Sequence, residues 1–353
     1  MNGRALDDLV ECLAGNVRVP RDWRALVALS SETLTIGTLA DALLDAPLSS
    51  EIPEEIRELL IEVRERARQR NEHLKAQFLE LLPALNSVGV EPIVMRGMAR
   101  LISDPSEESR LLSDIDLLVP GERLDECSKA LTDLGYSKFR AGEDMDVPSV
   151  FLRSSDVGMV DVHTRLQPTY LGLGHDRLAS SCHTVELGGG RALMPSPTTQ
   201  LLFIIVHDQL HDGDYWRGLV DMRHLVDIRR ISAEGVDWKE LEAYFPGRSP
   251  RNALRVQLRT ARSLMKIDIA DEYCGGAWTS FQELRRRVQV RAGILRPLFT
   301  LLTMMIDPPP RSNGGRKAGA RSESAGETAR RRLDHYFRGA NPGKLALKRL
   351  RAP

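Results

Sequence analysis

The sequence has few cysteines, and they are too scattered to build a cysteine-based structure. They are spread along the 353-residue chain with no CxxC spacing and no close pair, at Cys12, Cys127, Cys182 and Cys274. Zinc clusters and disulfide scaffolds both need cysteines at short, regular spacings. The pattern therefore argues against both and predicts a protein of the reducing cytoplasm.

Long hydrophobic runs are also absent from the sequence. The first ten residues include Asp7 and Asp8 and no long apolar stretch, so no N-terminal signal is predicted. No run approaches the roughly 18 to 20 apolar residues that a membrane-spanning helix needs. Residues 295–306 are apolar but too few, and we expect them to form a buried helix.

The chain as a whole has no excess of one charge. Lysine plus arginine and aspartate plus glutamate each number 49, so net charge gives no reason to expect a polyanion as the general partner. Residues 311–351, however, contain 12 basic and 3 acidic residues, which gives about +9 there and about −9 elsewhere. We predict a disordered basic tail over residues 308–353, with an anionic molecule as a candidate partner.

What the sequence does contain is a pair of carboxylates inside an apolar run. Asp114 and Asp116 stand one residue apart in Ser113-Asp114-Ile115-Asp116-Leu117-Leu118-Val119. In a β-strand, side chains two residues apart leave the same face. Two like charges so close are costly unless a cation lies between them, and Mg²⁺ prefers carboxylate oxygens. A charged pair at an exposed strand end is the alternative.

The segments on either side extend this pattern. Upstream, Val94-Met95-Arg96-Gly97 is typical of a strand that runs into a glycine turn and then a helix. Backbone N–H groups at such a turn, together with the helix N-terminus, favour a phosphate. Downstream, Val160-Asp161-Val162-His163 alternates and places Asp161 and His163 on one face of a second strand. We expect this strand to pair beside the Asp114 strand.

The order of these segments resembles the nucleotidyltransferase superfamily. More narrowly, the chain is similar to the bacterial family of uncharacterised nucleotidyltransferases in Val94-Met95-Arg96-Gly97, in Arg110 with residues 113–119, in Leu134-Gly135-Tyr136 and in Asp161-Val162-His163-Thr164-Arg165-Leu166. The similarity covers about residues 74–231. It implies an α+β fold related to the palm of DNA polymerase beta. In that fold a mixed sheet is flanked by helices, with N-terminal helices and a C-terminal helical domain.

The resemblance also implies a metal-dependent transferase that moves a nucleoside monophosphate from an NTP, with ATP expected, to an acceptor hydroxyl or phosphate. The catalytic residues, which would also hold one or two Mg²⁺ or Mn²⁺ ions, are Asp114, Asp116 and Asp161. Asp161 could also accept the proton of the acceptor hydroxyl. The nucleotide-binding residues would be Arg96, Gly97, Arg110, Ser113 and His163.

Two of these assignments have plain structural alternatives. Arg110 could be a surface arginine paired with Glu107 or Glu108. His163 could be a core histidine bonded to the backbone.

The sequence departs from the superfamily pattern at one position. Many superfamily members have Gly-Ser at the phosphate turn, whereas Met98 follows Gly97 here, so the serine hydroxyl is missing. This favours a second hypothesis, a catalytically silent module that binds or regulates. A third hypothesis keeps the chemistry and makes a protein the acceptor. The sequence leaves sugar, peptide, protein and RNA acceptors open.

We predict four regions along the chain. They are an N-terminal helical region (1–88), the catalytic domain (89–196), a C-terminal helical domain (197–307) and the basic tail (308–353). The first region should hold three short helices and one long helix over residues 53–88. In the third we expect single helices over residues 198–210, 215–231, 250–265 and 281–303.

The helical domain carries one motif with metal-ligand character. His207, Asp208 and His211 stand at positions i, i+1 and i+4 of a predicted helix. We reject metal binding by this motif, because similar histidines in the related family can equally orient a substrate or cap the sheet. The HExxH motif of zinc proteases is absent from the sequence, which removes support for that activity.

Overall fold

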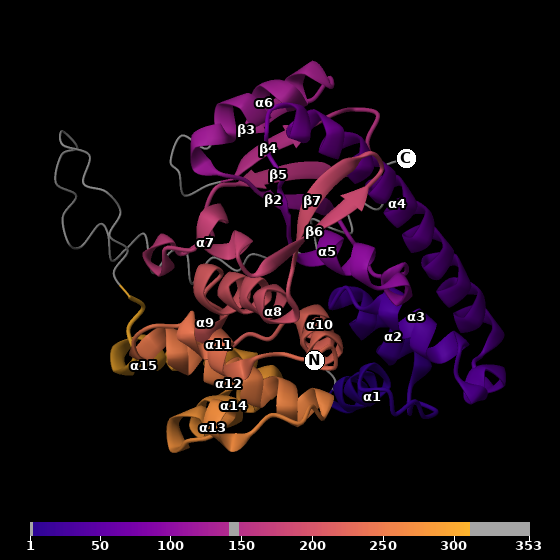
Figure 1. Ribbon diagram of the computed structural model, residues 1–353. Helices are drawn as coiled ribbons and strands as arrows, with labels where there is room; N and C mark the ends of the chain where they lie inside the picture. Colours follow the sequence, from indigo (N-terminus) through magenta and orange to yellow (C-terminus); the bar gives the residue numbers. More distant parts are fainter. Residues whose placement is uncertain (1–2, 141–147, 311–353) are drawn as a thin grey trace.

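A mixed seven-stranded sheet forms the centre of the protein (Figure 1). The computed structural model describes residues 3–140 and 148–310. The strands lie in the order β3-β4-β5-β2-β1-β7-β6. They are β1 (Ile93–Val94), β2 (Asp114–Leu118), β3 (Ser137–Arg140), β4 (Ser149–Leu152), β5 (Met159–His163), β6 (Cys182–Leu187) and β7 (Gly190–Pro195). β2 pairs in parallel with β5, and β1 with β7, while the other pairs are antiparallel. This confirms the predicted α+β class.

One face of the sheet is covered by a long helix. α4 (Glu54–Ser87) has 34 residues, as the predicted helix over residues 53–88 required. Its Leu74 and Phe78 pack with Ile115 of β2 and with Leu131 of α6 (Leu124–Asp133) in one apolar core. Ile115 and Leu117 both point into this core. Because side chains alternate along a strand, the carboxylates of Asp114 and Asp116 point to the other face of the sheet.

A second core joins the two ends of the described chain. The predicted N-terminal helices are α1 (Gly3–Leu13), α2 (Trp23–Glu32) and α3 (Ile36–Leu44). Their Leu9, Leu26 and Leu39 are fully buried in the same core as Leu225 and Val256 of the C-terminal helices. In Figure 1, α1 accordingly lies beside α12.

The C-terminal helices are more broken than the sequence suggested. The structure has α8 (Pro197–Ile205), a π-helix η5 (Val206–His211), α9 (Asp214–Arg217), α10 (Met222–Ser232), α11 (Trp238–Ala243), α12 (Arg248–Met265), α13 (Asp271–Cys274), α14 (Ala277–Arg291) and α15 (Arg296–Ile306). The predicted single helix over residues 215–231 is wrong, because Gly218 takes a left-handed φ of 67° that ends α9. The predicted single helix over 281–303 is also wrong, because a 3₁₀ turn over Gly293–Leu295 interrupts it.

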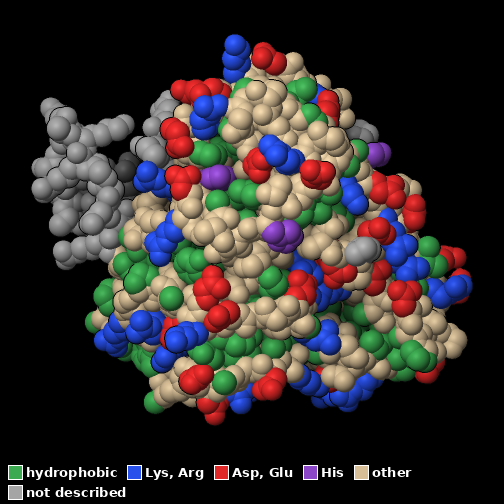
Figure 2. Space-filling view, in the orientation of Figure 1, with side chains coloured by type: hydrophobic (Ala, Val, Ile, Leu, Met, Phe, Trp, Pro, Cys, Tyr) green, Lys and Arg blue, Asp and Glu red, His purple; other side chains and the backbone are tan. Residues whose placement is uncertain are grey.

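The apolar segment at the end of the described chain is not buried as predicted. Along α15, Leu298 is 54% exposed and Met305 79% exposed. Hydrophobic side chains accordingly show on the surface in the region of α14 and α15 (Figure 2). A helix can be apolar on more than one side while only one side packs, so composition alone did not predict its burial.

The remaining elements connect these layers. They are α5 (Arg96–Ser103), α7 (His175–Ala179) and short 3₁₀ turns at Pro47–Glu51, Pro105–Glu107, Gly121–Arg123 and Thr169–Leu171. Within the described ranges, no helix combines the length and hydropathy needed to cross a membrane. Of the predicted basic tail, only residues 308–310 belong to the described part of the chain.

Candidate active site

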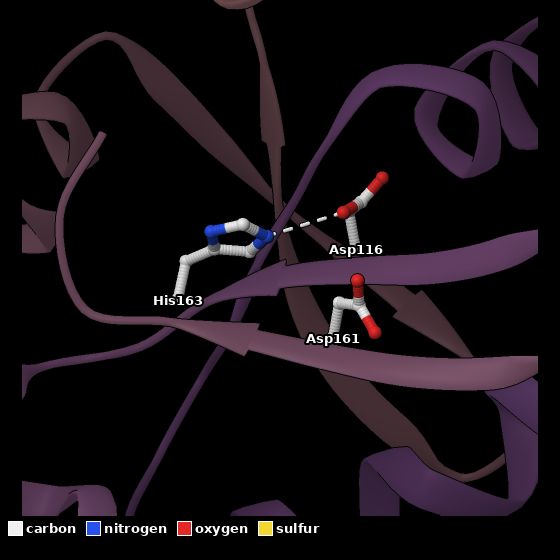
Figure 3. Close-up of side chains that lie close together, drawn as sticks. All are labelled: Asp116, Asp161 and His163. Carbon is white, nitrogen blue, oxygen red and sulfur yellow. Dashed lines mark hydrogen bonds and ion pairs between the residues drawn. The ribbon is translucent and has the colours of Figure 1, made fainter. Parts of the chain in front are cut away.

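The pairing of β2 with β5 brings the predicted aspartates together. The parallel register places Asp116 opposite Asp161 and Asp114 opposite Met159. One ligand atom each of Asp116, Asp161 and His163 lies within 4.8 Å of the other two. Figure 3 shows the three side chains on the same side of the two strands. The predicted neighbouring strands are therefore confirmed, and they create a compact group of potential metal ligands.

His163 contacts a carboxylate of this group. Its Nε2 lies 3.2 Å from Oδ1 of Asp116, as the dashed line in Figure 3 marks. The ring therefore contacts a carboxylate, whereas the alternative of a core histidine required a bond to the backbone. His163 is thus placed to orient Asp116, and its ring also lines the cavity described below.

Arg96 supplies the positive charge between the strands. Its guanidinium forms an ion pair with Asp116. Burial opposes ionisation of Asp116, but Arg96 and then His163 outweigh burial and hold the pKa of this carboxyl well below its usual range. Burial, followed by the charge of Asp116, raises the pKa of Asp114. The two carboxyls of β2 thus lie in one buried group but differ in how readily they ionise.

Gly97 lies at the start of α5 in tight packing with neighbouring side chains. The left-handed residue of this turn is Arg96, with φ of 46°. A Cβ at Gly97 would lie 2.4 Å from Cδ2 of Leu112 and 2.6 Å from Nη1 of Arg110. A larger residue at this position would therefore require the side chains of Leu112 and Arg110 to shift.

Arg110 is bound to the helical part of the molecule. Its Nη2 and Nε donate to the carboxylate of Asp227 on α10 at 2.6 and 3.2 Å, and both side chains are buried. The partner of Arg110 is therefore Asp227 and not Glu107 or Glu108. Glu107 pairs instead with Arg100 and Arg230. Arg110 thus links the sheet to α10, which sequence spacing could not reveal.

A cavity of about 210 Å³ opens beside the aspartates. One side, which we call the sheet wall, is formed by Arg96, Asp114, Asp161 and His163. The opposite side, the helical wall, is formed by Phe203, Val206, His207 and His211. Among the described residues, Gly97, Arg110 and Ser113 do not line it. The structure therefore brings five of the eight predicted site residues to the aspartate group, and it adds two histidines from the helical region.

A model of the uncharacterised nucleotidyltransferase family matches residues 20–266. The chain belongs to this family. No curated protein and no solved structure matches it. The match contains both walls of the cavity and ends before α13, so α14 and α15 lie beyond the part shared with the family model.

Nucleotidyltransferases generally use divalent metals, and the donor set of this family member suits one. Carboxylate oxygens from Asp116 and Asp161 converge, with Asp114 on the same face of β2. Mg²⁺ and Mn²⁺ prefer such oxygens, and Mn²⁺ also accepts the nitrogen that His163 offers. Burial and then the charge of Asp116 raise the pKa of Asp114, and a bound cation would favour the ionised form of this carboxyl.

Proposed function

We propose that this protein transfers a nucleoside monophosphate from an NTP, with ATP expected, to a hydroxyl or phosphate oxygen of an acceptor. The observation that carries the proposal is the register of β2 and β5, which sets Asp116 against Asp161 beside a cavity that Asp114 also lines. Asp114, Asp116 and Asp161 would hold the Mg²⁺ or Mn²⁺. When bound, the metal would neutralise charge on the phosphates.

The reaction requires one bond to form and one to break. The acceptor oxygen bonds to the α-phosphorus, the bond from that phosphorus to the bridging oxygen breaks, and pyrophosphate leaves. With a hydroxyl acceptor, the proton would pass to the carboxylate of Asp161, which lines the cavity. Arg96 can place its guanidinium charge on a phosphate once a cation shares the carboxylate of Asp116.

The test is incorporation of label from each of the four NTPs, labelled at the α-phosphate, with Mg²⁺ or Mn²⁺ and a cell extract. Wild-type protein should label an acceptor, and Asp116→Ala should lower the rate by about a thousandfold or more because it removes a metal ligand. Asp176→Ala is the matched control, since this aspartate is exposed and does not line the cavity. Equal labelling by wild type and Asp116→Ala would overturn the proposal.

The ion pair between Arg96 and Asp116 favours one second candidate, a silent binding module. A guanidinium that stays on Asp116 would occupy the position a metal needs, and Met98 offers no hydroxyl to a phosphate. Such a module would bind NTP in calorimetry while no NTP labels any acceptor.

If an acceptor is labelled, mass spectrometry of the labelled product would identify it and distinguish a modified protein from a sugar, peptide or RNA.

A further inference from the structure

The π-helix η5 brings together a second group of potential ligands in the helical region. His207, Asp208 and Asp212 each offer one ligand atom, and these atoms lie within 4.8 Å of one another. The amide of Asp212 donates to the carbonyl oxygen of His207 at 2.9 Å, the i to i+5 bond of a π-helix. The third ligand is therefore Asp212 at i+5, rather than the residue at i+4 that α-helical spacing points to.

His207 forms long contacts with both carboxylates, at distances that a shared ion would also span. Nδ1 of His207 lies 3.4 Å from Oδ1 of Asp208 and 3.6 Å from Oδ2 of Asp212. Two ligand atoms that are each about 2.1 Å from a tetrahedral ion lie about 3.4 Å apart. Direct N–H···O hydrogen bonds are typically about 2.7 to 3.2 Å long, and the neighbouring bond from His224 to Asp208 measures 2.7 Å.

The neighbouring side chains hold the group in place. Oδ2 of Asp208 accepts from Nδ1 of His224, which leaves Oδ1 directed toward His207. His224 also lies 3.8 Å from Asp221, whose carboxylate binds Arg223. A carboxylate ligand fixed by an outer hydrogen bond is typical of metal sites. Asp208 is buried, whereas the side chains of His207 and Asp212 are 34% and 43% exposed, so an ion can enter from solvent.

We propose that His207, Asp208 and Asp212 bind a transition-metal ion such as Zn²⁺ or Mn²⁺. A histidine nitrogen with two carboxylates selects such ions over Mg²⁺, which prefers an all-oxygen set. Three protein ligands leave one position of a tetrahedral ion open. Because His207 also lines the cavity, the ion would fix one side of the helical wall. This site is separate from the aspartates of β2 and β5, and it does not depend on the proposed nucleotidyl transfer.

The site can be tested by calorimetric titration of the chelator-treated, full-length protein with Co²⁺ in excess Mg²⁺. Co²⁺ accepts the same ligands and reports their geometry through its visible absorption. Wild type should bind one Co²⁺ that His207→Ala and Asp212→Asn each weaken at least about tenfold. Both changed side chains are partly exposed, so the variants should fold. Bound Co²⁺ should also raise the melting temperature of wild type more than that of His207→Ala.

The chain contains a matched control for the local His-Asp geometry. Nδ1 of His175 lies 3.3 Å from Oδ1 of Asp176, but no second carboxylate joins this pair among the described residues. His175→Ala should therefore leave Co²⁺ binding unchanged. Unchanged binding in His207→Ala would overturn the proposal, and so would an equal loss in His175→Ala.

Asp161→Asn separates this proposal from the proposed function. The Co²⁺ site at His207 should survive this change. If Asp161→Asn abolishes Co²⁺ binding while His207→Ala retains it, the ion belongs to the aspartates, and the His207 site is refuted with the proposed function intact. If His207→Ala loses Co²⁺ binding but no NTP labels an acceptor, the His207 site is supported and the proposed nucleotidyl transfer fails.

Discussion

A group of histidine and aspartate side chains lies at each wall of the cavity, and the two groups are assembled differently. At the sheet wall, Asp116, Asp161 and His163 come from two paired strands, and Arg96 forms an ion pair with Asp116. At the helical wall, His207, Asp208 and Asp212 come from a π-helix and the residue after it, and Asp208 is held by His224, sixteen residues further along the chain. Strand pairing gathers carboxylates on one face of a sheet, whereas a distorted helix gathers potential ligands that a neighbouring helix holds in place.

The segment before β2 is tied to α10 by the buried ion pair between Arg110 and Asp227, and breaking this pair should give the largest effect on stability. Removing one partner of a buried pair leaves the other charge uncompensated, at a cost of about 3 to 5 kcal/mol. Arg110→Met should lower the free energy of unfolding by that amount in urea titrations. The exposed pair of Arg57 with Glu54 is the matched control, and Arg57→Met should leave the free energy of unfolding nearly unchanged, because solvent screens an exposed pair.

A second variant checks the cause. Combining Arg110→Met with Asp227→Leu should recover most of the lost stability, because no buried charge is then left alone. If Arg110→Met instead keeps full stability and weakens NTP binding, Arg110 serves a phosphate, as its sequence motif suggested, and its role in holding α10 to the sheet is wrong.

The sequence predicted contacts between residues in local patterns better than contacts between residues far apart in the chain. The Asp-x-Asp spacing and the alternation around Asp161 are local, so strand period two sufficed to place three aspartates and His163 together. Arg110 and Asp227 are 117 residues apart, and no local pattern connects them. The sequence showed His207 and His211 as a motif, but it could not show that they face the aspartates across a cavity.

The helical region was harder to predict because its elements end through tertiary contacts. Gly218 interrupts the helix expected over residues 215–231, and a Cβ there would lie 2.0 Å from Oε1 of Gln289 on α14. The π-helix likewise replaced the last part of the helix expected over residues 198–210. Hydrophobic periodicity identified the helices but not these interruptions, which depend on packing partners far away in sequence.

Replacement by asparagine should change the free energy of unfolding in opposite directions at Asp114 and Asp116, the two carboxylates of β2. Asp116→Asn leaves buried Arg96 without its ion pair and should lower the unfolding free energy by about 2 kcal/mol, less than the 3 to 5 expected for an isolated partner because Asp114 and Asp161 remain near. Asp114→Asn removes a charge that burial and Asp116 oppose, so it should leave stability equal or higher. Urea titrations with a chelator at pH 7 measure both.

The pH dependence of the Asp116 effect follows from its lowered pKa. A carboxyl with a lowered folded-state pKa contributes stability above its unfolded pKa and loses it as the pH falls through the folded value. The difference in unfolding free energy between wild type and Asp116→Asn should therefore have its full size at pH 7 and keep it down to about pH 4. It should diminish only in stronger acid. Changes of the same sign in Asp114→Asn and Asp116→Asn would contradict the charge balance assigned to this wall.

The smallest effect should come from Gly97→Ala, which tests why glycine stands at the turn beside the sheet wall. Its φ is not left-handed, so the cost must come from packing against Leu112 and Arg110. The atoms met are side-chain ends that can shift, so we expect a loss of about 1 kcal/mol. Gly293→Ala is the control, because nothing lies within 4 Å of its added Cβ. In the Arg110→Met background the cost of Gly97→Ala should fall, because methionine lacks the guanidinium that Asp227 holds against the glycine. An equal cost in both backgrounds would assign the close approach to Leu112 alone.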